Sequence, residues 1–218
     1  MPALNDPDAQ LMLRVKDGDV EAFEMLVESY KGPVINLIYR NLKDRAEAED
    51  LAQNVFVQAY KSAARYLPTA KFSTWLFTIA RNLCLNEIRR RSRHPAFSLD
   101  QALDGDDSFM PQQFEDRSMS CASTEAMENE LIRKIDEALS DLPENQRTAV
   151  TLYRNRGLSY EEVSEVLGCS LSATKSLIHR AREILRIRLK DYLRTGEWVA
   201  RPEAPQRRKE RGVEGSRD

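Results

Sequence analysis

The chain has 218 residues, of which 41% are hydrophobic and 31% are charged. This length suits one sizeable domain or two small ones, and the hydrophobic fraction is enough for helical cores, so a wholly disordered chain is excluded. Basic and acidic residues nearly cancel, at 33 against 35, and the net charge of -2 taken alone argues against a nucleic-acid partner. The distribution of these charges along the chain argues the other way.

Two stretches are strongly basic and one is strongly acidic. Residues 71–93 contain six basic residues and one acid, and residues 175–194 contain seven basic residues and two acids, so each stretch carries a net charge of +5. Residues 100–130 contain nine acids and one base, a net charge of -8. The pattern predicts two cationic surfaces separated by an acidic strap.

The N-terminus and the cysteines narrow the class of protein. The opening MPALNDPDAQ lacks the basic patch and apolar run of a signal peptide, and no apolar stretch reaches the roughly 18 residues of a membrane span. We therefore expect a cytoplasmic protein that does not insert into membranes. Cys84, Cys121 and Cys169 are far apart and have no CxxC pair or nearby paired histidine, so we expect no disulfide framework, metal site or cofactor.

Apolar residues at helical spacing dominate, without sustained strand alternation, which predicts an all-α fold. A first helical domain is expected over residues 1–94. Gly32-Pro33 interrupts its early periodic face and is expected to kink or split that helix. Asp44 and Glu47 have the spacing of a capping box, which predicts a helix over about 45–65.

The next expected helix has Ser73 as its N-cap and ends in the basic run RRRSR, at residues 89–93. Residues 95–123 lack a periodic apolar face and are rich in serine, aspartate and glutamine, which predicts a flexible acidic linker. A second helical domain is expected over 124–194. Residues 195–218 are expected to form a disordered tail.

The second domain contains the spacing of a helix-turn-helix. Ser159 and Glu162 form a second capping box, Gly168 follows at a tight turn, and a longer basic helix is expected to begin near Ser170. Such an arrangement lets the second helix enter a DNA major groove, where arginine and lysine can hydrogen-bond guanine edges; an ordinary solvated face is the alternative. The outward candidates are Lys175, Ser176, His179, Arg180 and Arg182.

These residues carry a resemblance to a known family. The segment SLSATKSLIHRAREILRIRL resembles the helix with which bacterial RNA polymerase sigma factors read the minus-thirty-five element, and DLPENQRTAVTLYRNRGLSYEEVSEVLG resembles the rest of that domain. The segments DRAEAEDLAQNVFVQAYKSAARY and FSTWLFTIARNLCLNEIRRRSR resemble their other DNA-binding domain. The matches cover most of residues 8–194 in the family's order. The short length points to the extracytoplasmic-function (ECF) class.

The resemblance implies core RNA polymerase, through its β′ clamp helices and β flap, and promoter DNA as partners. It also implies an anti-sigma factor that masks both domains, which could hold the chain at the membrane, and no small-molecule substrate. The implied polymerase surface lies on residues 44–60, although core packing is the alternative for its apolar members. Its candidate contacts are Asp50, Leu51, Gln53, Asn54 and Phe56.

The resemblance further implies that the loop 62–71 captures a flipped base of the non-template strand. Tyr66 could stack on that base while Asn82 reads its edge, although simple core packing is the alternative for Tyr66. Phe72, Trp75 and Phe77 are expected to be structural. The other residues implied to lie on the minus-ten element are Lys71, Arg81, Asn86, Arg89, Arg90, Arg91 and Arg93.

The sequence thus predicts a non-enzymatic specificity subunit that directs core polymerase to promoters and promotes strand opening. The main alternative is a stand-alone helix-turn-helix regulator whose N-terminal half is a sensor or a dimerisation domain. A nucleic-acid enzyme fits poorly, because the chain has only His94 and His179, no carboxylate cluster at metal-type spacing and no phosphate-cradling glycine loop.

Overall fold

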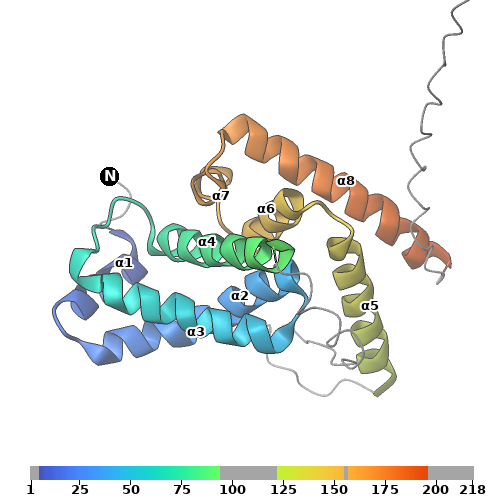
Figure 1. Ribbon diagram of the computed structural model, residues 1–218. Helices are drawn as coiled ribbons and strands as arrows, with labels where there is room; N and C mark the ends of the chain where they lie inside the picture. Colours follow the sequence, from blue (N-terminus) through green and yellow to red (C-terminus); the bar gives the residue numbers. More distant parts are fainter. Residues whose placement is uncertain (1–4, 94–121, 155–156, 196–218) are drawn as a thin grey trace, which may run out of the picture.

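The computed structural model describes residues 5–93, 122–154 and 157–195, and in these ranges the regular elements are all helices (Figure 1). The N-terminal bundle consists of α1 (Pro7–Lys16), α2 (Val20–Leu42), α3 (Arg45–Ser62), the short 3-10 helix η2 (Ala63–Arg65) and α4 (Phe72–Arg93). The C-terminal half consists of α5 (Ala122–Ser140), α6 (Glu144–Arg154), α7 (Tyr160–Leu167) and α8 (Leu171–Thr195). The all-α prediction is confirmed. Most of the predicted linker and of the predicted tail lies outside the described residues.

Helix α2 runs without a break through Pro33, so the predicted split at Gly32-Pro33 does not occur. A proline inside a helix costs about 3 kcal/mol, because it removes an amide donor and crowds the preceding turn. Burial on both sides of the proline offsets this cost. The fully or almost fully buried side chains of α2 include Leu26, Tyr30, Val34, Leu37 and Ile38.

The N-terminal core is built around aromatic rings from α2 and α4. The Tyr30 ring lies 5.2 Å from that of Phe72 and 6.3 Å from that of Phe77, both edge to face, and all three side chains are buried. Trp75 lies partly buried beside them, 5.8 Å from Phe72. The expectation that Phe72, Trp75 and Phe77 are structural is confirmed.

Helix α4 starts one residue before the predicted N-cap, so Ser73 lies inside the helix. The amide of Phe72 donates instead to Asp6 Oδ2, at 2.8 Å, while Asp6 Oδ1 accepts from the Asp8 amide at the start of α1, at 3.3 Å. One carboxylate therefore satisfies free amides at the beginnings of two helices. The separation of 66 residues explains why the local pattern did not reveal this cap.

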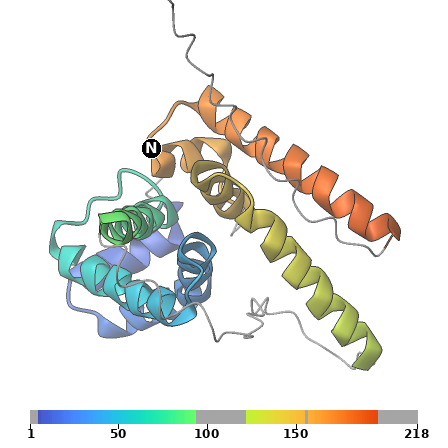
Figure 2. The same ribbon diagram turned by 45° about the vertical axis from the view of Figure 1, so that its right-hand side comes forward.

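The two halves of the molecule are packed against each other. Figures 1 and 2 show α6 and α7 between the N-terminal bundle and α8. One buried apolar cluster runs from the N-terminal bundle into Leu152, Val163 and Ile178. The polar contacts across this junction are Arg147 to the Arg40 carbonyl (2.9 Å), Arg40 to Asp136 (3.3 Å), Thr148 to Asn41 (3.1 Å) and Lys71 to Glu162 (2.6 Å).

Candidate nucleic-acid interface

Helices α7 and α8 form the helix-turn-helix that the sequence predicts. The Glu162 amide donates to Ser159 Oγ at 3.2 Å, and the Ser159 amide donates to Glu162 Oε2 at 2.7 Å, so both halves of the capping box are present. Gly168 ends α7 in the left-handed conformation, with φ of 62°, which glycine adopts without a side-chain clash. The capped short helix and the glycine turn fix the direction in which α8 leaves.

The N-terminal half of α8 presents an exposed polar face. The five predicted DNA-contact residues of α8, Lys175, Ser176, His179, Arg180 and Arg182, are all exposed. Ile178 is 1% exposed and anchors the opposite side of the helix in the core. Among the described residues, Lys175 and Arg180 have no ion-pair partner, whereas Arg186, further along the same helix, pairs with Glu183 at 2.6 Å. The free cations therefore lie where the helix would approach DNA.

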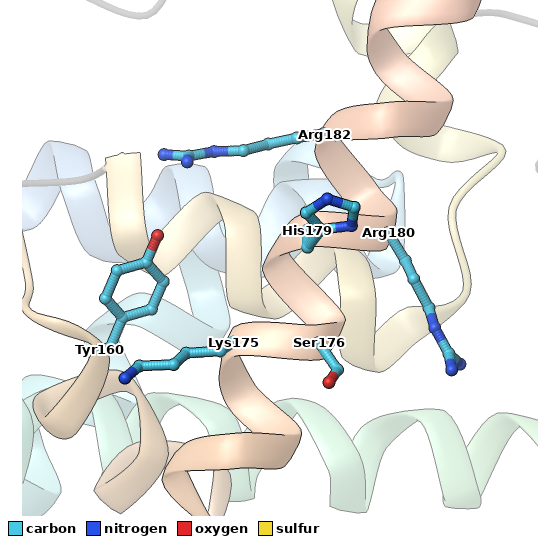
Figure 3. Close-up of a pocket in the computed structure, with 6 residues that line it drawn as sticks. All are labelled: Tyr160, Lys175, Ser176, His179, Arg180 and Arg182. Carbon is cyan, nitrogen blue, oxygen red and sulfur yellow. The ribbon is translucent and has the colours of Figure 1, made fainter.

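An open pocket of about 490 Å³ separates the start of α7 from this face of α8 (Figure 3). Lys175 and Arg182 extend from α8 on the side where the Tyr160 ring stands, and Arg180 extends on the other side. The residues that line the pocket are Tyr160, Lys175, Ser176, His179, Arg180 and Arg182. This concentration of donors and positive charge suits an anion.

Two tyrosines that the sequence analysis did not single out lie next to Arg182. The rings of Tyr153 and Tyr160 are 4.9 Å apart, and the Arg182 guanidinium carbon lies 4.6 Å from the centre of the Tyr153 ring. Hydrogen bonding with Arg182, and then with Tyr160, lowers the pKa of the Tyr153 phenol. The guanidinium thus lies over an aromatic ring, an arrangement that is favourable for a cation.

The basic end of α4 is partly neutralised within the fold. Arg90 donates to both carboxylate oxygens of Glu87 at 2.8 Å, and Arg91 pairs with Glu87 at 3.2 Å and also with Glu47 of α3. Among the described residues, Arg89 and Arg93 have no ion-pair partner and are exposed. Since a paired arginine must give up its internal partner to bind a phosphate, Arg89 and Arg93 are the more available cations.

Glu47 also departs from its expected role. The Asp44 carboxylate accepts from the Glu47 amide at 2.9 Å, which is one half of the predicted capping box. The Glu47 side chain, however, pairs with Arg90 at 3.5 Å and with Arg91. A helix 43 residues away in sequence thus offers a stronger partner, because an ion pair with two arginines replaces a single hydrogen bond to an amide.

The loop between η2 and α4 has a buried base and an exposed tip. Tyr66 is 3% exposed, its ring lies edge to face with Trp75 at 5.0 Å, and burial raises the pKa of its phenol to about 12. Its hydroxyl has no hydrogen-bond partner among the described residues. Leu67, the next residue, is 66% exposed. The Tyr66 ring is therefore packed in the core, where it supports the loop.

The remaining minus-ten candidates are spread along α4 and its approach. Asn82 and Asn86 are exposed, and Arg81 is half-buried. Lys71 pairs with the capping-box residue Glu162, and this hydrogen bond raises the pKa of the Lys71 ammonium. The predicted minus-ten surface therefore touches the helix-turn-helix directly.

Comparisons with known proteins identify the two halves. Residues 26–94 match the family model of sigma-70 region 2, and residues 132–185 match that of sigma-70, region 4. The chain is 34% identical over 194 residues to the RNA polymerase sigma-H factor of Pseudomonas aeruginosa, covering 87% of this chain and 97% of that relative. It is 34% identical over 178 residues to the ECF RNA polymerase sigma factor SigW of Bacillus subtilis, covering 82% and 94%.

The chain belongs to the ECF class of the sigma-70 family. It is a sigma factor, as the sequence predicts, and the stand-alone regulator is not favoured. The fold is similar to that of CnrH in its complex with the cytosolic domain of CnrY, with a TM-score of 0.61, 22% identity and coverage of 85% and 99% of the two chains. It is also similar to the sigma factor RpoE of Bartonella quintana in complex with the anti-sigma factor NepR, with a TM-score of 0.60, 25% identity and coverage of 77% and 96%.

Within region 2, the residues predicted to contact polymerase divide by exposure. Asp50, Gln53 and Asn54 are exposed on α3, whereas Leu51 is half-buried and Phe56 is buried. Val57 and Tyr60 are large, about half exposed and on the same helix, and the Tyr60 ring packs on Phe23 at 5.0 Å. The exposed part of this sigma factor's α3 is therefore a mixed polar and apolar surface.

No group of histidine, cysteine and acidic residues among the described positions has the arrangement of a metal site. Cys84 is buried, and burial raises the pKa of its thiol to about 12, which makes the nucleophilic thiolate rare. None of the helices in the described ranges has the length and hydropathy needed to cross a membrane.

Proposed function

We propose that this sigma factor binds core RNA polymerase through α3, reads the minus-ten element with α4 and the loop before it, and reads the minus-thirty-five element with α8. The observation that carries the proposal is the exposed, cationic face of α8 directly after the capped helix α7. The protein itself catalyses no reaction; it gives polymerase its promoter preference and acts in the bacterial cytoplasm, where polymerase meets the chromosome.

A run-off transcription assay tests this proposal. The full chain is mixed with core polymerase and a library of promoter fragments, and we expect transcripts of defined length from a subset of them. Core polymerase alone is the control. Tight, sequence-specific binding of the chain to DNA in the absence of polymerase, with no transcript from any fragment, would instead support a stand-alone regulator.

The polymerase contact is proposed for the exposed side of α3. Asp50, Gln53 and Asn54 offer polar groups there, which suit the β′ clamp helices, while Leu51 and Phe56 hold α3 against the bundle. A residue buried in the core acts on the contact only by keeping the helix in place. We accordingly assign the direct contacts to the three polar residues and a supporting role to the two apolar ones.

Strand opening is proposed to depend on Asn82 directly and on Tyr66 through its ring. Asn82→Ala should lower the population of open promoter by about 2- to 13-fold, because an amide that hydrogen-bonds an unpaired base contributes about 0.5–1.5 kcal/mol. Tyr66→Phe should open promoters normally, since the Tyr66 hydroxyl is buried without a hydrogen-bond partner among the described residues. Permanganate footprinting of unpaired thymines measures both.

Asn145→Ala is the matched control for Asn82, because it removes an exposed amide from α6, outside the predicted minus-ten surface. Initial binding to closed promoter DNA should remain nearly unchanged in Asn82→Ala. Loss of opening in Tyr66→Phe would contradict the supporting role, and would mean that the loop rearranges to bring the hydroxyl to the base.

The packed arrangement of regions 2 and 4 is proposed to open on polymerase. The two promoter elements lie about 25 base pairs apart, or about 85 Å along B-DNA at roughly 34 Å per ten base pairs. Two domains in direct contact through α4 and α7 do not span this distance. The 28 residues from 94 to 121 could reach about 95 Å at full extension, so the chain is long enough to let the domains separate.

An anti-sigma factor is proposed as a further partner. CnrH and the Bartonella RpoE, to which the fold is similar, are both seen in complexes, with the cytosolic domain of CnrY and with the anti-sigma factor NepR. A partner that favours the docked arrangement would keep this sigma factor from spanning a promoter. It would also provide a route for holding the chain at a membrane.

A further inference from the structure

The loop between η2 and α4 is fastened at both ends by α1, which packs against both of these helices (Figure 1). Lys16, in the last turn of α1, donates to the Tyr66 carbonyl at 3.4 Å, where the loop begins. Asp6, the N-cap of α1, accepts from the Phe72 amide at 2.8 Å, where the loop ends. The two ends of one helix thus hold the two ends of the loop.

Helix α1 is itself fixed in the bundle. Ala9 and Met12 are fully buried, and the Asp8 carboxylate accepts from the Tyr30 hydroxyl. The Tyr30 ring in turn packs edge to face on that of Phe72, at 5.2 Å. Because α1 is anchored by both apolar and polar contacts, its hydrogen bonds restrict the backbone of the loop rather than follow it.

The tip of the loop is exposed and has a turn of its own. Leu67 is 66% exposed, and the Thr69 amide donates to the Leu67 carbonyl at 2.8 Å, which closes a tight turn around Pro68. This turn shapes the tip, whereas the contacts with α1 set its direction. A surface that is already ordered loses less conformational entropy on binding than a free loop does.

We propose that Asp6 and Lys16 are positioning residues for strand opening, which hold the loop 66–71 in the conformation that captures an unpaired base. The inference rests on the proposed function, in which this loop acts on the minus-ten element. Both residues act through the backbone of the loop and not by touching the base. Helix α1 lies before the region 2 match, which begins at residue 26, so the family match does not assign this role.

The two oxygens of Asp6 serve two helices. Oδ1 accepts from the Asp8 amide at 3.3 Å, in the first turn of α1, and Oδ2 accepts from the Phe72 amide. An asparagine side chain has one acceptor oxygen where a carboxylate has two, yet asparagine is an equally good N-cap. Asp6→Asn can therefore cap one helix but cannot join the two, which breaks the link between α1 and α4 with little loss of helix stability.

The test uses the full chain bound to core polymerase and forked promoter fragments, in which the minus-ten element of the non-template strand is single-stranded. An abasic site is placed at each position of this element in turn, and the affinity of each fragment is compared with that of the intact one. We call the largest ratio the abasic penalty. The wild type should show a penalty of about 5- to 150-fold, because a captured base stacks on the protein.

Asp6→Asn and Lys16→Met should each reduce the abasic penalty by about 2- to 13-fold. A loop that loses one of its hydrogen bonds is competent for only part of the time and gains less from the base. Lys16→Arg keeps a donor and should retain the wild-type penalty. A change of net charge alters the affinity for intact and abasic fragments alike, so it cancels in the ratio.

Two matched controls keep the charge changes but spare the loop. Asp19 is the N-cap of α2 and accepts from the Ala22 amide at 3.0 Å, so Asp19→Asn makes the same chemical change at another helix. Lys31→Met removes an exposed lysine from α2. Both controls should retain the wild-type penalty. Thermal unfolding followed by circular dichroism checks that all the variants are folded.

An unchanged penalty in both Asp6→Asn and Lys16→Met would overturn the positioning role. Equal losses of affinity on intact and abasic fragments would then mean that the two residues only stabilise the bundle. A wild-type holoenzyme without an abasic penalty at any position would overturn the proposed base capture, and the positioning role with it. The wild type therefore tests the proposed function, and the variants test the role of α1.

Discussion

Transcription from promoters that depend on the minus-thirty-five element should fall about 5- to 150-fold when Arg180 is replaced by alanine. The side chain is exposed on α8 and has no ion-pair partner among the described residues, so its donors are available to a base edge. A bidentate contact from arginine contributes about 1–3 kcal/mol of discrimination, which corresponds to this range. Run-off transcription from matched templates, with intact and with altered minus-thirty-five elements, measures the effect.

The control for Arg180→Ala is Lys190→Ala, which also removes one positive charge from α8. The preference of the holoenzyme for the intact element should collapse only in Arg180→Ala. An equal loss on both templates would mean that Arg180 binds a phosphate, and an unchanged preference would refute its assignment to the promoter contact altogether.

The replacement Arg147→Ala should separate the two domains. Arg147 donates to the Arg40 carbonyl at 2.9 Å and to the Leu142 carbonyl at 3.0 Å, and so ties α2 to the C-terminal half. A hydrogen bond from a charged group contributes about 1.5–3 kcal/mol, and Arg147→Ala removes the one that crosses the interface. Small-angle X-ray scattering should therefore show a larger radius of gyration for the variant.

The variant Arg154→Ala removes an exposed arginine from the same helix, α6, and should leave the radius of gyration unchanged. Circular dichroism at 222 nm checks that both variants keep their helices. If Arg147→Ala remains as small as the wild type, apolar packing alone holds the domains together, and the polar contacts across the junction do not decide their separation.

Local patterns predicted the helix-turn-helix well. The capping box of Ser159 and Glu162 and the turn at Gly168 depend on residues at most three positions apart or on one backbone angle. Such contacts form in any context where the helix forms, because the partners are already neighbours in the chain. The exposed face of α8 followed from the same periodicity.

The local sequence pattern predicted the structure less well where a residue could also contact a distant part of the chain. Glu47 has the right spacing for a capping box, but its side chain pairs with two arginines of α4. Ser73 has the residue type of an N-cap, but Asp6 accepts the hydrogen bond from the first amide of α4 instead. Pro33 lies in an unbroken helix because burial along α2 offsets its cost. In each case a contact across the fold outweighs a local preference of about 1–3 kcal/mol.

The charge count along the chain showed two cationic stretches but not which cations are free. Glu87 is near the arginines of α4 in sequence, whereas Glu47 reaches them only through the packing of α3 on α4. The pairing of Lys71 with Glu162 depends in the same way on the docking of the two domains. The availability of a charge for DNA is thus a tertiary property.

The sequence by itself determined the all-α class, the two regions and the outward face of α8, because helical periodicity and capping are encoded within a few residues. Only the tertiary structure decided that Tyr66 is buried, that Tyr153 and Tyr160 lie beside Arg182, and that regions 2 and 4 are packed together. The physical reason is that burial, ring contacts and ion pairs between helices depend on which amphipathic faces pack against each other. One apolar pattern along a helix is compatible with many different packing partners.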